Sequence, residues 1–113
     1  MKLQELVDSL SLEVKTAPSN LTKEVTGGYV SDLLSDVIAN SKKGNIWITL
    51  QTHQNIVAVA TLKDLSGIIL VNNRTPDAET LKKAEDEGLP ILVSPLPAFE
   101  LVGRLYTLGL RCQ

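Results

Sequence analysis

The chain has 113 residues, of which 43% are hydrophobic and 21% are charged. This is the composition of an ordinary globular protein, and it excludes a disordered chain. A chain of this length can bury about two-thirds of its unfolded surface, so we expect a single domain over residues 1–113. The formal net charge is -2, and the dispersed basic residues lack the patch that typifies nucleic-acid-binding proteins.

Cys112 is the single cysteine, which excludes an intramolecular disulfide and the spacings of zinc ligands. A reducing compartment is therefore expected. Residues 1–10 have the pattern of an amphipathic helix rather than of a signal peptide. The longest apolar stretch, residues 56–60, is too short to span a bilayer. We expect a cytoplasmic protein without membrane association, cofactor or metal site.

The first part of the chain alternates between helix and strand. Apolar side chains at helical spacing predict an opening helix: Leu3, Leu6, Val7 and Leu10. A short strand is expected at residues 12–15, a turn at residues 17–20 and a second strand at residues 25–30. The next helix is expected to start at Ser31 or Asp32 and to end near residues 40–44.

The second part of the chain continues the alternation. Buried strands are predicted at residues 46–50, 67–71 and 91–93. Residues 56–65 favour a helix, although Val57 and Val59 are weak helix formers and a strand remains open.

Two more helices are predicted near the end of the chain. One covers residues 77–87, with Thr75 as its cap and Pro76 at its first position, and the other covers residues 97–108. Alternating strands and helices are typical of βαβ units. The sequence therefore predicts an α/β fold, with three α/β/α layers and a mainly parallel central sheet.

Two adjacent glycines, Gly27 and Gly28, stand where a strand is expected to meet a helix. Glycine lets other groups approach the backbone closely, and free amides at a helix start attract anions. Loops after parallel strands also gather at one edge of a sheet. We therefore expect a small anionic metabolite or nucleotide to contact Thr26, Gly27, Gly28, Tyr29, Ser31, Asp32, Gln51, Thr52, His53 and Asn72. It remains open that these loop residues are polar because they are solvated and cap helices.

No catalytic motif accompanies these residues. The glycine pair is neither GxGxxG nor a P-loop, and no nucleophile elbow or Ser/Cys-His-Asp order is present. His53 has no second histidine, cysteine or carboxylate in its loop, so we expect it to donate a hydrogen bond to a ligand or to start a helix. Asp32 and Asp36 have the spacing of paired carboxylates on one helix face, but in a first turn we expect them to favour the helix dipole instead. Tyr29 is a candidate for stacking on a ring, and a small enzyme that uses His53 and Asp32 ranks last.

Residues 21–37, with the sequence LTKEVTGGYVSDLLSDV, resemble the signature of the DRTGG domain family. Residues 44–53 and 56–60 are also similar to members of this family, so the resemblance covers nearly the whole chain. The Asp-Arg pair of the family appears here as Thr22-Lys23, whereas Thr26-Gly27-Gly28 is intact. Lysine lacks the planar fork of arginine and threonine has no carboxylate, so a bidentate contact at these positions is not carried over.

The resemblance implies a single DRTGG-like domain related to the N-terminal domain of HPr kinase and phosphorylase, without the kinase domain. In larger proteins such modules accompany CBS domains or enzymes, look regulatory and sometimes lie beside adenine-nucleotide sites. The leading hypothesis is therefore a non-catalytic regulatory module that binds a small anionic metabolite or adenine nucleotide and forms a homodimer. The alternative is an assembly module that docks a partner enzyme and holds no small-molecule ligand.

Overall fold

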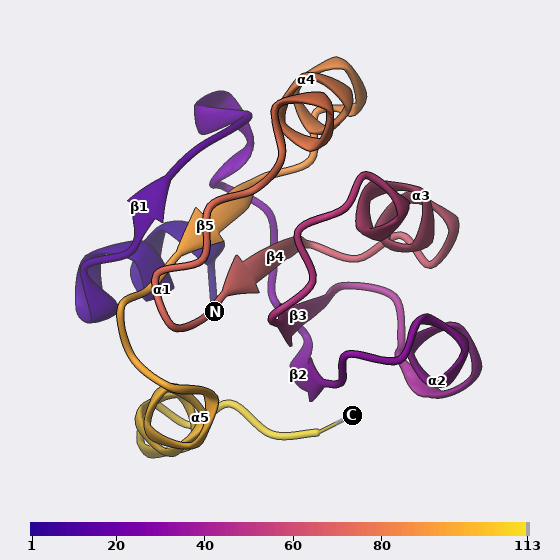
Figure 1. Ribbon diagram of the computed structural model, residues 1–113. Helices are drawn as coiled ribbons and strands as arrows, with labels where there is room; N and C mark the ends of the chain where they lie inside the picture. Colours follow the sequence, from indigo (N-terminus) through magenta and orange to yellow (C-terminus); the bar gives the residue numbers. More distant parts are fainter. Residues whose placement is uncertain (113) are drawn as a thin grey trace.

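The computed structural model describes residues 1–112 and contains one five-stranded sheet with helices on both faces (Figure 1). Along the chain the elements are α1 (Leu3–Leu10), β1 (Glu13–Val14), the 3-10 helix η1 (Pro18–Asn20), β2 (Gly27–Val30), α2 (Leu34–Asn40), β3 (Asn45–Thr49), α3 (Asn55–Leu62), β4 (Gly67–Leu70), α4 (Ala78–Glu87), β5 (Ile91–Val93) and α5 (Ala98–Thr107). Within residues 1–112, the helices are all too short or too polar to cross a membrane.

The strands lie in the order β1-β5-β4-β3-β2. Strands β2 to β5 are parallel, and β1 is antiparallel to β5. The register places Tyr29 opposite Trp47, and Trp47 opposite Ile68. These observations confirm the predicted α/β fold with a mainly parallel sheet.

Successive side chains of a strand point to opposite faces of the sheet, and each face has its own hydrophobic cluster. Ile46 and Ile48 of β3 pack with residues of α1 and α5. Trp47 of the same strand packs with residues of α2, α3 and α4. Figure 1 shows the same division, with α2, α3 and α4 on one side of the sheet and α1 and α5 on the other. Trp47 is 0% exposed, so the molecule has three layers.

Two predicted helix starts are wrong. Helix α2 begins at Leu34 rather than at Ser31 or Asp32, because the Asp32 side chain binds β3 and the Ser31 hydroxyl accepts a hydrogen bond from the Leu33 N–H. These contacts hold the chain extended before the helix. Helix α4 begins at Ala78 with extended Asp77, not Thr75, at its N-cap. Of the two structures left open for residues 56–65, the helix is the one that forms.

Candidate functional site

The two adjacent glycines do not form an open cradle. Gly27 and Gly28 begin β2, and Gly27 lies opposite Asn45, the first residue of β3. The Gly28 N–H donates to the Arg111 carbonyl (3.0 Å), and the Thr26 N–H donates to the Gly44 carbonyl (3.0 Å). The expectation that these amides are free for an anion is therefore wrong. They are bonded to the protein's own backbone because the glycines begin a strand instead of ending one.

The ten residues expected at one site lie in separate places. Thr26 and Gly27 lie at the amino edge of the sheet, where β2 and β3 begin, and Gly28 and Tyr29 follow within β2. The remaining six come after the carboxyl ends of strands, at the opposite edge: Ser31, Asp32, Gln51, Thr52, His53 and Asn72. The expectation that the glycine amides and His53 face one opening is therefore wrong. A role of these residues in ligand binding stays a prediction.

Side chains at the carboxyl edge of β2 and β3 bind one another. One carboxylate oxygen of Asp32, Oδ1, accepts hydrogen bonds from the Thr49 hydroxyl and the Leu50 N–H, both 2.8 Å long. The Gln51 side chain donates to the Asp32 carbonyl (3.0 Å). The Trp47 indole donates to the Ser31 carbonyl (2.8 Å). We call Ser31, Asp32, Trp47, Thr49 and Gln51 the Asp32 network. It fixes the segment after β2 against the end of β3.

The other predicted residues at this edge also make local contacts. The Thr52 carbonyl accepts from the Thr80 hydroxyl (2.7 Å), and His53 Nδ1 accepts from the Asn55 N–H (3.1 Å) at the start of α3. Asn72 has a left-handed backbone (φ 55), and its N–H donates to the Leu96 carbonyl (2.9 Å). These contacts favour the alternative that the loop residues cap helices and join loops.

The hydroxyl of Tyr29 is also engaged. It donates to Asp36 Oδ2 (2.8 Å), and the Asn40 side chain donates to Asp36 Oδ1 (2.9 Å). The hydrogen bond from Tyr29, followed by those from Ser31 and Asn40, lowers the pKa of Asp36 below its usual 3.8. The same bond, together with partial burial, raises the pKa of Tyr29 above its usual 10.0. The ring packs against the cluster under α2 and α3, so Tyr29 supports α2.

A cavity of about 270 Å³ lies between β2 and α5. We call it the α5 cavity, and its volume approaches the lower end of small-molecule pockets, ~300 Å³. It is lined by Gly28, Tyr29, Val30, Ile48, Val102, Leu105, Tyr106, Leu110, Arg111 and Cys112. Most of these side chains are apolar. Of the ten residues predicted for the site, Gly28 and Tyr29 lie at this cavity.

Arg111 is the charged residue among those that line the α5 cavity. Its guanidinium lies 3.7 Å from the centre of the Tyr106 ring, in cation–π geometry. One nitrogen donates to the carbonyls of Tyr106 (2.8 Å) and Leu110 (3.0 Å) at the end of α5. Arg111 takes part in none of the ion pairs found within residues 1–112. Its remaining N–H groups therefore suit an anion.

Sequence reasoning missed Arg111 and the α5 cavity. A basic residue just after a helix is commonly expected to bind the last carbonyls of that helix, and Arg111 does this. Its position beside a cavity depends on contact between residues 28–30 and residues 102–112, which are far apart along the chain. No short motif carries that information. Within residues 1–112, no group of three or more His, Cys, Asp or Glu residues is placed to hold a metal ion.

Comparison with known proteins gives a structural match only. No family model and no curated protein matches the sequence. The chain is similar to the crystal structure of the CBS and DRTGG domains of the regulatory region of Clostridium perfringens pyrophosphatase, complexed with its activator, diadenosine tetraphosphate. The TM-score is 0.74 at 19% identity, over 97% of this chain and 47% of the other. The chain thus spans about half of that structure and has a DRTGG-related fold.

Proposed function

We propose that this protein is a non-catalytic regulatory module that binds a small anionic ligand of the adenine-nucleotide class. The observation that carries the proposal is Arg111 among the residues that line the apolar α5 cavity, with no carboxylate partner among residues 1–112. An apolar wall suits the organic part of a ligand, and a guanidinium suits a phosphate or carboxylate. The adenine dinucleotide bound in the similar regulatory region supports this ligand class.

Calorimetric titration and thermal unfolding with AMP, ADP, ATP, diadenosine tetraphosphate, glucose 6-phosphate and inorganic phosphate test the proposal. We expect heat of binding and a raised Tm with the adenine nucleotides, because a ligand at a hundred times its Kd stabilises the folded state by about 2.7 kcal/mol. The variant Arg111→Gln should bind ATP more weakly. Arg104→Gln is the matched control, because Arg104 is exposed on α5 and pairs with Glu100. Absence of heat and of any shift in Tm throughout the panel contradicts the proposal.

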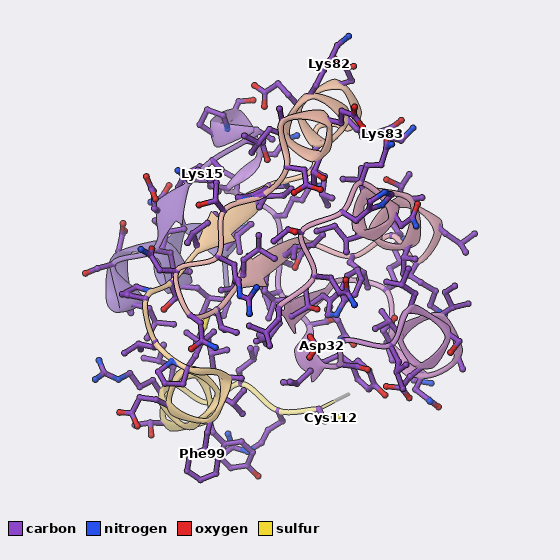
Figure 2. All side chains as sticks on the ribbon, viewed as in Figure 1. Lys15, Asp32, Lys82, Lys83, Phe99 and Cys112 are labelled. Carbon is purple, nitrogen blue, oxygen red and sulfur yellow. The ribbon has the colours of Figure 1, made fainter. Side chains whose placement is uncertain are left out.

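A second candidate function is protein assembly, and exposed apolar side chains favour it. Phe99 and Tyr106 of α5 are 92% and 57% exposed, and Val30 of β2 is 48% exposed. Figure 2 shows Phe99 pointing away from the sheet on the outer side of α5. Exposed apolar patches of this kind mark interaction surfaces. We propose that a homodimer forms through this face, and that a partner enzyme is the alternative occupant.

Light scattering at micromolar concentration measures the assembly. We expect a mass of about 25 kDa, twice the 12.3 kDa of one chain. The variant Phe99→Asp should be monomeric. Leu62→Asp should stay dimeric, because Leu62 is 69% exposed but belongs to α3 on the other side of the sheet. A monomeric wild-type protein rules out the homodimer, and affinity capture then shows whether a partner enzyme binds through Phe99.

A further inference from the structure

We infer that the α5 cavity holds the adenine ring of the nucleotide, that the outer edge of β2 recognises the polar edge of this ring, and that Arg111 binds the phosphates. This inference rests on the proposed function and gives it a location and a basis for selectivity. It replaces the loops at the carboxyl edge as the main contact surface. Three properties of the cavity support it.

The first property is the match between cavity and ring. The cavity measures about 270 Å³ and is walled by aliphatic side chains such as Val102, Leu105 and Leu110. A flat heteroaromatic ring fits such a space, and its faces gain apolar contacts there. A sugar phosphate lacks an apolar part, and burying its hydroxyl groups against aliphatic side chains without hydrogen bonds carries a large penalty. The cavity therefore favours the base of a nucleotide over a free sugar phosphate.

The second property is the outer edge of β2 beyond Gly28. In a parallel pair, alternate residues of one strand hydrogen-bond to the neighbouring strand. The Ser31 N–H donates to Ile48 of β3 (3.3 Å), whereas the Gly28 N–H donates outward to Arg111. By this alternation the N–H and C=O of Val30 face outward as well. No backbone partner outside the strands is found for either group within residues 1–112, and Val30 lines the cavity.

Val30 thus presents a donor and an acceptor side by side at the cavity. Adenine carries an amino donor beside a ring-nitrogen acceptor, so its edge complements these two groups. Guanine has an oxo group in place of that amino group and carries an additional amino group elsewhere. In the same orientation the oxo group would face the Val30 carbonyl, so that two acceptors oppose each other, and the additional amino group would lack a partner, which is unfavourable. We therefore expect adenine nucleotides to bind in preference to guanine nucleotides.

The third property is the position of Arg111. Its contact with the Tyr106 ring and its bonds to two carbonyls hold the guanidinium beside Tyr106 and Leu110, which both line the cavity, and a phosphate attached to a bound base would meet it there. An arginine held in this way binds a phosphate with two parallel hydrogen bonds. In this arrangement the phosphates supply the affinity of the nucleotide for the protein, and the ring determines where the nucleotide binds.

The test compares ATP, GTP and adenosine on three full-length variants. Val102→Trp fills the cavity from its partly exposed side, and we expect at least a tenfold loss of ATP affinity. Leu62→Trp is the matched control and should bind ATP as the wild type does. Arg111→Gln should lose at least fivefold in ATP affinity but keep its affinity for adenosine. GTP should bind the wild type at least tenfold more weakly than ATP.

Amide NMR of the wild-type protein gives a measurement that does not depend on variants. On addition of ATP we expect the largest shifts at Val30 and Arg111, and small shifts at Asp32 and Gln51. Unchanged ATP binding by Val102→Trp, equal binding of GTP, or largest shifts in the Asp32 network would each overturn the inference while the proposed function stands. If the wild type binds no nucleotide at all, both fall.

Discussion

The carboxyl edge of β2 and β3 and the α5 cavity differ in how far their polar groups are satisfied. At the carboxyl edge, Asp32 accepts hydrogen bonds from Thr49 and Leu50, and Gln51 and Trp47 bind the adjoining backbone. At the α5 cavity, the outward groups of Val30 have no backbone partner outside the strands among residues 1–112. Polar side chains gathered in loops thus stabilise this fold. An apolar cavity beside outward-facing backbone groups is the better candidate for a ligand.

The largest expected effect concerns the side chain that joins the core to the carboxyl edge. Trp47 is 0% exposed, and its indole donates to Ser31. The variant Trp47→Ala should lose about 3 to 5 kcal/mol in the free energy of unfolding, as is typical of buried aromatic side chains. Urea denaturation measures the loss. The control Leu62→Ala should change stability by less than about 0.5 kcal/mol, and a similar small change for Trp47→Ala would show that this edge does not depend on the core.

A smaller effect is expected at the centre of the Asp32 network. The variant Asp32→Ala should lose about 1 to 2 kcal/mol, because the hydroxyl of Thr49, which is 2% exposed, loses its acceptor. Asp32→Asn keeps an acceptor oxygen and should lose less. The exposed Asp86→Ala is a matched control on α4. If Asp32→Ala is as stable as the wild type but binds ATP more weakly, the carboxyl edge is a ligand site. That edge, and not the α5 cavity, is then the better candidate.

The pair of Tyr29 and Asp36 predicts a modest dependence of stability on pH. The pKa of Asp36 is lowered on folding, so its stabilisation is present above its usual 3.8 and is lost as the pH falls through the folded value. The pKa of Tyr29 is raised, so its stabilisation is present below its usual 10.0 and is lost as the pH rises through the folded value. Urea denaturation of wild type and Tyr29→Phe across this range should show that the variant loses the alkaline dependence and has a weaker acid dependence, because Ser31 and Asn40 still lower the pKa of Asp36. Equal curves would mean that the pair does not act as described.

The smallest effect is expected at Gly28. A Cβ atom there would meet Leu110 at 3.5 Å, an ordinary contact, so Gly28→Ala should change stability by less than about 1 kcal/mol. Gly44 differs, because its φ is +82° and a Cβ would lie 2.7 Å from the Thr26 side chain. Gly44→Ala should lose about 1 to 3 kcal/mol. Thermal unfolding distinguishes the two. A large loss for Gly28→Ala would restore a special backbone role for the glycine pair.

The fold was predictable because the sequence pattern has a direct physical cause. The apolar runs around Trp47 and Ile68 are buried on both faces, and helices alternate with them, so a covered parallel sheet follows. The start of α2 was not predictable, because it depends on hydrogen bonds between Asp32 and β3 that only the folded chain creates.

The candidate site was less predictable than the fold. Polar loop residues after β3 and β4 were correctly assigned to one edge, because parallel strands end together. Their mutual hydrogen bonds and the strand position of Gly27 and Gly28 were not visible in the pattern. The α5 cavity requires β2 and the end of the chain to meet, and such long-range contact leaves no local signal.

The two edge strands of the sheet, β1 and β2, affect the solubility of the protein. Strand β1 is only two residues long, and the four-residue β2 is crossed at Gly28 by the backbone of Arg111. An exposed edge strand can pair with strands of other molecules, and such pairing leads to aggregation. Because β1 is short and the segment at Arg111 lies against β2 at Gly28, little backbone at either edge is available for such pairing. Removal of residues 110–113 should therefore make the protein prone to aggregate even where it still folds.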